Sequence, residues 1–174
     1  MTLTPHAFAP GWERRAVVYQ VYPKSFLDAD GDGIGDLPGL TEKLDYIADL
    51  GADTVWLIDQ GYDMADYAAV NPLFGTLEDV DALIEEGRRR DIKIILDIAL
   101  NHCSTQHPWF QEALANPGGP YADYFIWRKP GADGAAPNNW PSVFGGPAWT
   151  TPEGHDRAYL HLFDKSQADL NWDN

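Results

Sequence analysis

The order of apolar and polar residues over the first hundred positions predicts short buried strands that alternate with helices. Residues 16–22 (Ala-Val-Val-Tyr-Gln-Val-Tyr) form a β-branched and aromatic run that ends at Pro23, which is typical of a buried strand. Residues 54–58 form a second such run, and residues 92–100 form a third that is nearly continuous in apolar side chains. Because parallel sheets are buried on both faces, strands of this kind favour a parallel sheet.

Two helices are predicted between these strands from their apolar spacing and their end signals. The first follows Asp36, a good N-cap residue, and ends at Gly51, with leucine and isoleucine recurring at helical spacing. The second follows Thr76, and Asp79 stands at the position of a capping-box partner. Strands that alternate with single helices form right-handed βαβ units, so the predicted fold class is α/β.

The chain changes character after the third strand. Seven of the 16 glycines and seven of the 13 prolines lie between positions 116 and 154, and five of the seven tryptophans lie within 103–174. A linker would leave so many large aromatic side chains in water. We therefore expect a compact, loop-rich subdomain with short strands, for example at 124–127 and 159–163.

Composition and charge narrow the range of partners. The 174 residues include 12 basic and 27 acidic side chains, which gives a formal net charge of −15. This charge argues against nucleic acid and against an anionic membrane, because both repel it at long range. The single cysteine, Cys103, excludes an intramolecular disulfide. With no signal-peptide pattern and no apolar stretch of about 18 residues, a cytoplasmic location is expected.

The strongest local pattern is the loop Asp-Ala-Asp-Gly-Asp-Gly-Ile-Gly-Asp at 28–36. Carboxylates at alternate positions, with glycines that permit a tight turn, can surround a hard cation with oxygen atoms. The candidate ligands are the side chains of Asp28, Asp30, Asp32 and Asp36 and the main-chain carbonyl of Ile34. The loop is not an EF-hand, since its twelfth position is Gly39 instead of glutamate. An acidic surface turn is the alternative, but four aspartates repel one another without a cation, which favours a metal site.

Polar and aromatic side chains follow the second and third strands at the same end of the predicted sheet. Asp97 lies within the third strand and His102 at its carboxyl end, while Asp59 and Tyr62 follow the second strand. In parallel barrels this end of the sheet carries the active site. Asp59, Tyr62 and His102 together would offer an aromatic platform and hydrogen-bonding groups suited to a sugar. A purely structural histidine is the alternative for His102.

Together these segments resemble the N-terminal part of a glycoside hydrolase of the α-amylase family, of the α-glucosidase or oligo-1,6-glucosidase type. The segments that carry the resemblance are Val-Val-Tyr-Gln-Val-Tyr-Pro-Lys-Ser-Phe at 17–26, the loop at 28–36, Gly61-Tyr62-Asp63, residues 97–102, His107-Pro108-Trp109-Phe110, Pro137-Asn138-Asn139-Trp140, Phe144-Gly145-Gly146 and Leu160-His161-Leu162-Phe163. They extend over almost the whole chain, and their combination is more specific than any single motif.

The resemblance implies the architecture and the activity of the parent enzyme. Residues 1–102 would hold the first three βα units of a (β/α)₈ TIM barrel, with strands one to three and two helices. Residues 103–174 would form a Gly/Pro/Trp-rich subdomain inserted after strand three. A complete barrel needs roughly 250 residues, so this chain is too short to hold one. The parent would be a retaining hydrolase of short α-linked gluco-oligosaccharides.

The resemblance also implies roles for individual residues. The aspartate loop would bind structural Ca²⁺. Tyr62 would stack on a terminal glucose, Asp59 and His102 would bind its hydroxyls, and Phe144 would form a wall of the pocket. Asp97 would be a structural acid beneath the site.

Two departures from the family pattern change what is expected of this chain. Relatives carry a longer loop between the second strand and the Gly-Tyr-Asp element, whereas here Trp56-Leu57-Ile58 leads directly to Asp59. The family's nucleophilic aspartate and acid/base glutamate follow strands four and five, so no catalytic residue is assigned in this chain. Because retaining glycosidases need both carboxyl groups, the chain alone is predicted to be inactive.

The incomplete sheet bears on partners and on alternative functions. Three strands would leave an unpaired edge, which predicts completion by the missing C-terminal portion of the barrel or self-association. The alternative function is a non-catalytic module derived from the family that binds sugar or calcium or interacts with another chain. A vestigial protein without a selected activity is a third interpretation. The expected ligand is an α-glucosidic oligosaccharide.

Overall fold

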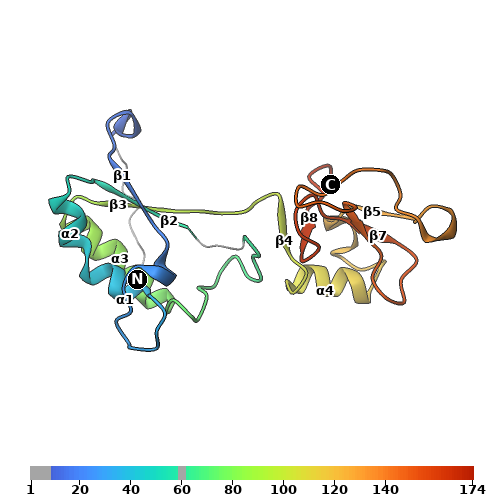
Figure 1. Ribbon diagram of the computed structural model, residues 1–174, viewed down its shortest axis with the longest axis horizontal. Coiled ribbons are helices and arrows are strands. Elements are labelled where there is room, and N and C mark those ends of the chain that lie inside the picture. The colour runs from blue at the N-terminus through green and yellow to red at the C-terminus, as the bar shows by residue number, and fades with distance from the viewer. Residues whose placement is uncertain (1–8, 59–61) are drawn as a thin grey trace. The chain divides into compact units, whose positions relative to one another are not determined.

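The computed structural model describes residues 9–58 and 62–174 (Figure 1). By their internal contacts these residues fall into two compact units. The first unit comprises residues 9–58 and 69–97, and the second comprises residues 62–68 and 98–174. The sequence-based domain division between residues 102 and 103 stays a prediction.

The first unit is built on a three-stranded parallel sheet in the order β1-β2-β3 (Figure 1). The strands are β1 (Val18–Val21), β2 (Thr54–Leu57) and β3 (Lys93–Leu96). Their register aligns Tyr19 with Val55 and Val55 with Ile94, which confirms the predicted parallel sheet. The strands are shorter than the apolar runs that predicted them, because the central strand offers only four residues for pairing.

Three helices connect these strands, and their ends follow local signals in the sequence. They are α1 (Leu37–Glu42), α2 (Leu44–Asp49) and α3 (Leu77–Arg89). The Asp36 carboxylate accepts a hydrogen bond from the Gly39 amide at 2.6 Å and caps α1. Thr76 and Asp79 form the complete predicted capping box at α3. None of the helices in residues 9–58 and 62–174 is long and apolar enough to cross a lipid bilayer.

The helix predicted between Asp36 and Gly51 is divided in two at Lys43. The Thr41 hydroxyl donates a hydrogen bond to the Leu37 carbonyl one turn earlier, at 2.8 Å. Such a contact competes with the main-chain hydrogen bonds of the helix and bends it, which gives a physical reason why the predicted helix is divided.

The hydrophobic core of the first unit lies between the sheet and the three helices, which cover one side of it (Figure 1). Its most deeply buried side chains are Leu40, Leu44, Ile47, Val55 and Leu83. None of the three helices covers the opposite face, where Val18 is 48% exposed. The strands are therefore not buried on both faces as expected, since burial of the second face requires a second layer.

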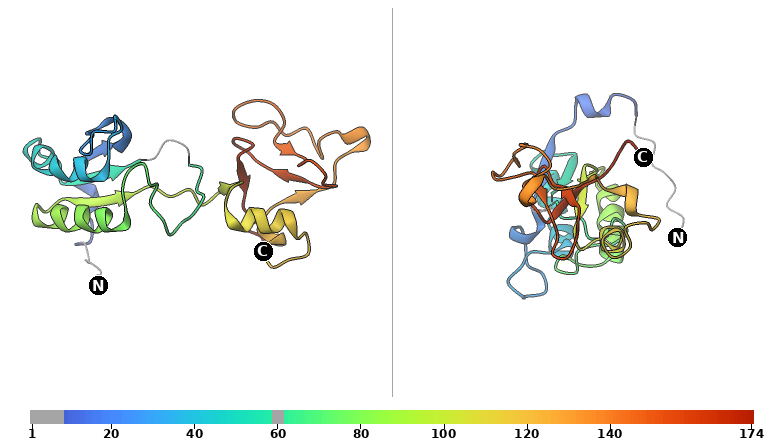
Figure 2. Two further views of the ribbon diagram at one scale, coloured as in Figure 1. Left: turned by 90° about the horizontal axis from the view of Figure 1, so that it is seen from below. Right: turned by 90° about the vertical axis from the view of Figure 1, so that its right-hand side faces the viewer.

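The second unit consists of short antiparallel strands and one helix. Its elements are β4 (His102–Ser104), α4 (Pro108–Ala115), β5 (Trp127–Arg128), β6 (Trp149–Thr150), β7 (Ala158–Leu160) and β8 (Gln167–Asp169). β4 pairs with β8, and a second sheet has the order β5-β7-β6. Figure 2 shows α4 beside these strands. Single turns of 3₁₀ helix occur in both units at η1 (Trp12–Arg14), η2 (Pro23–Ser25) and η3 (Ala122–Tyr124). The segment η4 (Ala132–Gly134) is a turn whose Asp133 and Gly134 have positive φ angles, so it is not helical.

Aromatic side chains form the core of the second unit. Phe110 of α4 packs against Phe125, Trp127 and Tyr159, with ring centroids 5.1, 5.7 and 5.0 Å away. This packing confirms that the aromatic-rich segment is compact and is not a linker. Of the strand predicted at 124–127, only Trp127 lies in a strand, because the chain makes a 3₁₀ turn just before it.

Candidate functional site

The structure places the predicted sugar-site residues in different parts of the chain. Tyr62, His102 and Phe144 belong to the second unit, and Asp97 belongs to the first. Asp97 is half-buried, and its amide donates to the Leu57 carbonyl at 3.3 Å, which extends the pairing of β3 with β2. Asp59 lies outside the described residues.

His102 is held by hydrogen bonds at both nitrogens of its ring. It lies on β4 and is only 5% exposed. Its Nδ1 is 3.3 Å from the Asn101 amide nitrogen, which is a donor, so Nδ1 accepts. Its Nε2 therefore carries the proton and donates to the Tyr62 carbonyl at 3.0 Å. Burial lowers the pKa of His102, so the ring is neutral at neutral pH.

Asp169 lies opposite His102 in the β4–β8 pairing and is connected to it through Asn101. The Oδ1 atom of Asp169 accepts hydrogen bonds from the Asn101 side-chain amide at 3.2 Å and from the Leu162 main-chain amide at 3.3 Å. The side chain is only 3% exposed, and burial raises its pKa to about 6. Asn101 thus bridges a buried acid and a buried imidazole.

The main chain of Tyr62 is fixed while its side chain reaches solvent. Its φ angle is +48°, a left-handed conformation that non-glycine residues adopt rarely and at some cost. Its carbonyl accepts from His102 and from the Gln167 side-chain amide at 3.4 Å. The residue is 41% exposed, so part of its ring is accessible to a ligand.

Phe144 extends the aromatic surface near His102. It is 71% exposed, and its ring centroid lies 6.2 Å from that of Phe163. The Phe163 ring lies 5.1 Å from the His102 ring. Within the second unit, His102 thus contacts the main chain of Tyr62 and the ring of Phe163, and Phe163 in turn contacts Phe144.

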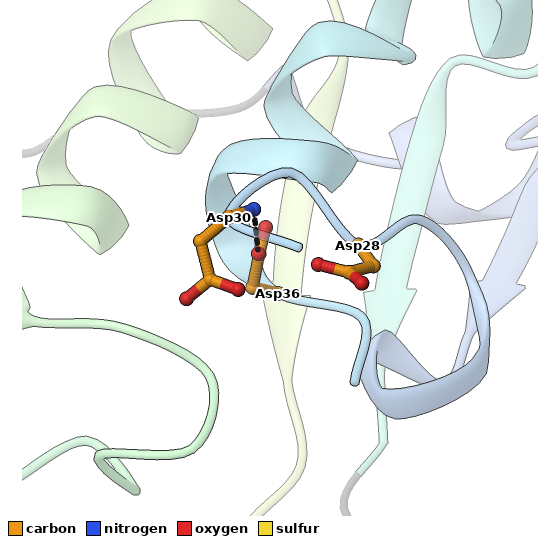
Figure 3. A group of neighbouring side chains, drawn as sticks. All are labelled: Asp28, Asp30 and Asp36. Atoms are coloured by element: carbon orange, nitrogen blue, oxygen red, sulfur yellow. Dashed lines mark hydrogen bonds between the residues drawn. The ribbon is translucent and has the colours of Figure 1, made fainter. Parts of the chain in front are cut away.

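The aspartate loop forms a separate candidate site in the first unit (Figure 3). Asp28, Asp30 and Asp36 each contribute an oxygen atom, and these three atoms lie within 4.8 Å of one another. Asp36 is buried at the base of the loop, where its Oδ2 accepts from the amides of Ala29 and Asp30. Asp28 accepts from the amides of Gly31 and Gly33, and these hydrogen bonds lower its pKa.

Asp32, the fourth predicted carboxylate ligand, is not part of this group of three. The Oδ1 atom of Asp32 instead accepts a hydrogen bond from the Ile34 amide at 2.7 Å. The Asp32 side chain thus forms a local turn with the main chain two residues later, as short aspartate side chains do readily. The side chain of Ile34 packs against the hydrophobic core of the first unit, and its main-chain carbonyl stays a predicted ligand.

The structure also reveals supporting residues that sequence reasoning missed. Asp169 and Asn101 are brought together by pairing of strands far apart in the sequence, and no local pattern marks them. Tyr67 supports the same strand, since its hydroxyl lies 3.0 Å from the carbonyls of Ala99 and His102. Burial raises the pKa of Tyr67 to about 12, so it stays a neutral donor.

Residues 20–174 match the alpha-amylase family, specifically its catalytic domain. The chain therefore belongs to this family of glycoside hydrolases, which confirms the resemblance seen in the sequence. It is 52% identical to a glucan 1,6-alpha-glucosidase of Streptococcus pneumoniae over 94% of its length. It is 50% identical to an oligo-1,6-glucosidase of Parageobacillus thermoglucosidasius, also over 94% of its length.

The same relationship holds at the level of structure. The crystal structure of a trehalose-6-phosphate hydrolase from Bacillus licheniformis superimposes with a TM-score of 0.90, at 47% identity and over 94% of this chain. The chain spans 31% of that structure, and 31% and 30% of the two curated relatives. The similarity is thus to one part of a longer enzyme.

Proposed function

We propose that the chain is the N-terminal portion of a retaining α-glucosidase-type hydrolase that acts on short α-linked gluco-oligosaccharides. The observation that carries this proposal is the match to two 1,6-glucosidases at about half identity over nearly the whole chain. The aromatic and polar neighbourhood of Tyr62 and His102 supports a sugar ligand. A cytoplasmic location remains part of this proposal.

The proposed architecture places this chain in a (β/α)₈ barrel. The sheet β1-β2-β3 and its helices would be the first three units of the barrel, and the second unit would be the subdomain after strand three. The parallel order and the helices on one face support this assignment. The exposed face that includes Val18 would become the interior of the closed barrel.

In the proposed glucose site, Tyr62 stacks on the sugar ring and Phe144 forms a wall. Asp59, proposed from the sequence alone, and His102 bind hydroxyls, and Asp97 supports the end of its strand. The Nε2–H group of His102 already donates to the Tyr62 carbonyl at 3.0 Å. To bind a sugar hydroxyl, His102 must share this proton between the hydroxyl and the carbonyl.

Cleavage requires two carboxyl groups about 5–5.5 Å apart, one as nucleophile and one as proton donor. We assign neither to this chain, so it binds sugar without cleaving it. The edges of β1 and β3 would pair with the remaining strands of the barrel or with a second copy. A non-catalytic binding module is the second candidate, and the lack of the two family carboxylates favours it for the chain by itself.

We also propose that the aspartate loop holds a structural Ca²⁺. Ligand oxygens at about 2.3–2.6 Å from one calcium ion can be at most roughly 5 Å apart, and the three oxygens of Asp28, Asp30 and Asp36 meet this limit. Hard carboxylate oxygens are the ligands that calcium prefers. The side chain of Asp32 and the carbonyl of Ile34 are proposed to complete the shell. A cation there would offset the repulsion among the acids.

The sugar site is tested by titrating the full chain with isomaltose under NMR detection. Loss of a stacking ring costs about 0.5–1.5 kcal/mol, so Tyr62→Ala is expected to weaken binding roughly two- to tenfold. Tyr46→Ala is the matched control, because Tyr46 is also an exposed tyrosine, at 50% against 41% for Tyr62, but lies in the first unit. Equal affinities of the two variants would remove Tyr62 from the site.

A further inference from the structure

Three Asp-Gly pairs occur in the chain, and they differ in their hydrogen bonding. They are Asp30-Gly31, Asp32-Gly33 and Asp133-Gly134. In an Asp-Gly pair the glycine has no side chain to shield its amide nitrogen, which can attack the preceding carboxyl group. Whether the attack takes place depends on how firmly that amide and that carboxyl are held.

The two pairs in the aspartate loop are held by hydrogen bonds. The Asp28 carboxylate accepts from the Gly31 amide at 2.6 Å and from the Gly33 amide at 2.8 Å. An amide that donates to a carboxylate is harder to deprotonate, and its nitrogen is directed away from any other acceptor. The carboxyl groups that would be attacked are held as well. Asp30 accepts a hydrogen bond from the Asp32 amide, and Asp32 accepts one from the Ile34 amide.

The third pair lies in an exposed turn without such contacts. Asp133 and Gly134 have φ angles of +59° and +76°, and the Ala135 amide donates to the Ala132 carbonyl at 3.2 Å, as in a type I′ turn. Residues 131–136 are all exposed. Among the described residues, neither the Asp133 carboxylate nor the Gly134 amide makes a hydrogen bond.

We propose that Asp133 is a site of spontaneous isoaspartate formation and that Asp28 protects the other two pairs from the same reaction. The Gly134 nitrogen forms a bond to Cγ of Asp133, and the carboxyl hydroxyl leaves as water with the amide proton. Water then adds to the resulting succinimide at one of its two carbonyls. Breaking the bond to Cγ restores aspartate, and breaking the main-chain bond gives isoaspartate, so the mass of the product is unchanged.

The modification would act on the loop that joins β5 to the following segment. Isoaspartate inserts a methylene group into the main chain and shortens the side chain that carries the charge. It also removes the need for a left-handed non-glycine residue at this position, which is uncommon and strained. Isoaspartate is therefore favoured because it relieves the backbone strain at Asp133 and because water can reach the exposed turn.

The test follows isoaspartate at each of the three pairs in one sample. The full chain is incubated at mildly acidic pH with a calcium chelator, digested, and examined by mass spectrometry with electron-transfer fragmentation, which distinguishes isoaspartate. We expect accumulation at Asp133 to be several-fold faster than at Asp30 or Asp32. The chelator ensures that protection of the loop does not depend on the proposed calcium ion.

Two variants and a measurement in denaturant test whether the folded structure, and not the local sequence, sets the rate of isoaspartate formation. Asp28→Ala is expected to accelerate the reaction at Asp30 and Asp32 and leave Asp133 unchanged. Gly134→Ala is expected to suppress it at Asp133 by shielding the amide nitrogen. The added β-carbon meets no atom within 4 Å, and its cost is the strain of a non-glycine residue at a φ of +76° in this exposed turn. In denaturant the three rates should converge. Equal rates in the folded chain, or no acceleration in Asp28→Ala, would overturn the proposal.

Discussion

Replacing Asp169 by asparagine is expected to stabilise the second unit at neutral pH. Burial raises the pKa of Asp169 from its ordinary value of 3.8 to about 6. Because folding raises this pKa, the contribution of Asp169 to the free energy of unfolding is most favourable below pH 3.8, where the carboxyl group is protonated. This contribution is lost as the pH rises through about 6. Above that pH the folded chain carries a buried carboxylate whose charge is only partly compensated.

The magnitude follows from the size of the pKa difference. Two pKa units between the unfolded and folded states correspond to about 3 kcal/mol, since one unit is worth about 1.4 kcal/mol. Asparagine keeps an oxygen that can accept from Leu162 and Asn101, so the substitution removes the charge and preserves both hydrogen bonds. The variant should therefore gain up to about 3 kcal/mol over the native chain between pH 4 and pH 7.

The assay is urea unfolding at a series of pH values, followed by tryptophan fluorescence. Five of the seven tryptophans lie in the second unit and report on it. Asp164→Asn is the control, because the Ser166 amide lowers the pKa of Asp164 and stabilises its charged form. That variant should lose stability relative to the native chain as the pH rises. A difference between Asp169→Asn and the native chain that does not change with pH would refute the reasoning.

Three further predictions concern the first unit. Calcium is expected to raise its unfolding temperature, and Asp30→Ala should abolish this increase, whereas the control variant Asp49→Ala on α2 should retain it. An unfolding temperature of the native chain that calcium does not change would exclude the metal site. Leu83→Ala removes a fully buried side chain and should cost about 2–5 kcal/mol in urea unfolding, and a loss below 1 kcal/mol would contradict the described core. Among residues 9–58 and 62–174, β1 and β3 pair only with β2, and their open edges predict association on size-exclusion chromatography at high concentration. A compact monomer at every concentration would contradict this prediction.

Features that depend on neighbouring residues were predictable from the sequence. The capping box of Thr76 and Asp79 and the cap at Asp36 lie within one helical turn, so their pattern alone is sufficient. The parallel sheet followed from apolar runs separated by single helices. The division of the first helix at Lys43 was not visible, because it depends on a hydroxyl rotamer of Thr41.

Features that depend on distant contacts or on competing local geometry were not predictable. Asp169 and Asn101 support His102 only because β8 pairs with β4 in one particular register. Among the aspartates of the loop, spacing alone did not indicate that Asp32 would hydrogen-bond to the Ile34 amide. Burial of the sheet on one face is also a property of the layers around it, which apolar strands cannot specify by themselves.

We propose that this chain provides the glucose-binding part of an α-glucosidase-type hydrolase without the two catalytic carboxyl groups. The most direct test is hydrolysis of an aryl α-glucoside by the purified 174-residue chain, with an intact oligo-1,6-glucosidase as positive control. We predict no release of the aryl alcohol above that of a sample without protein. Turnover that copurifies with the chain and is lost in His102→Ala would contradict the account, because a working site would then exist without the family's two carboxylates.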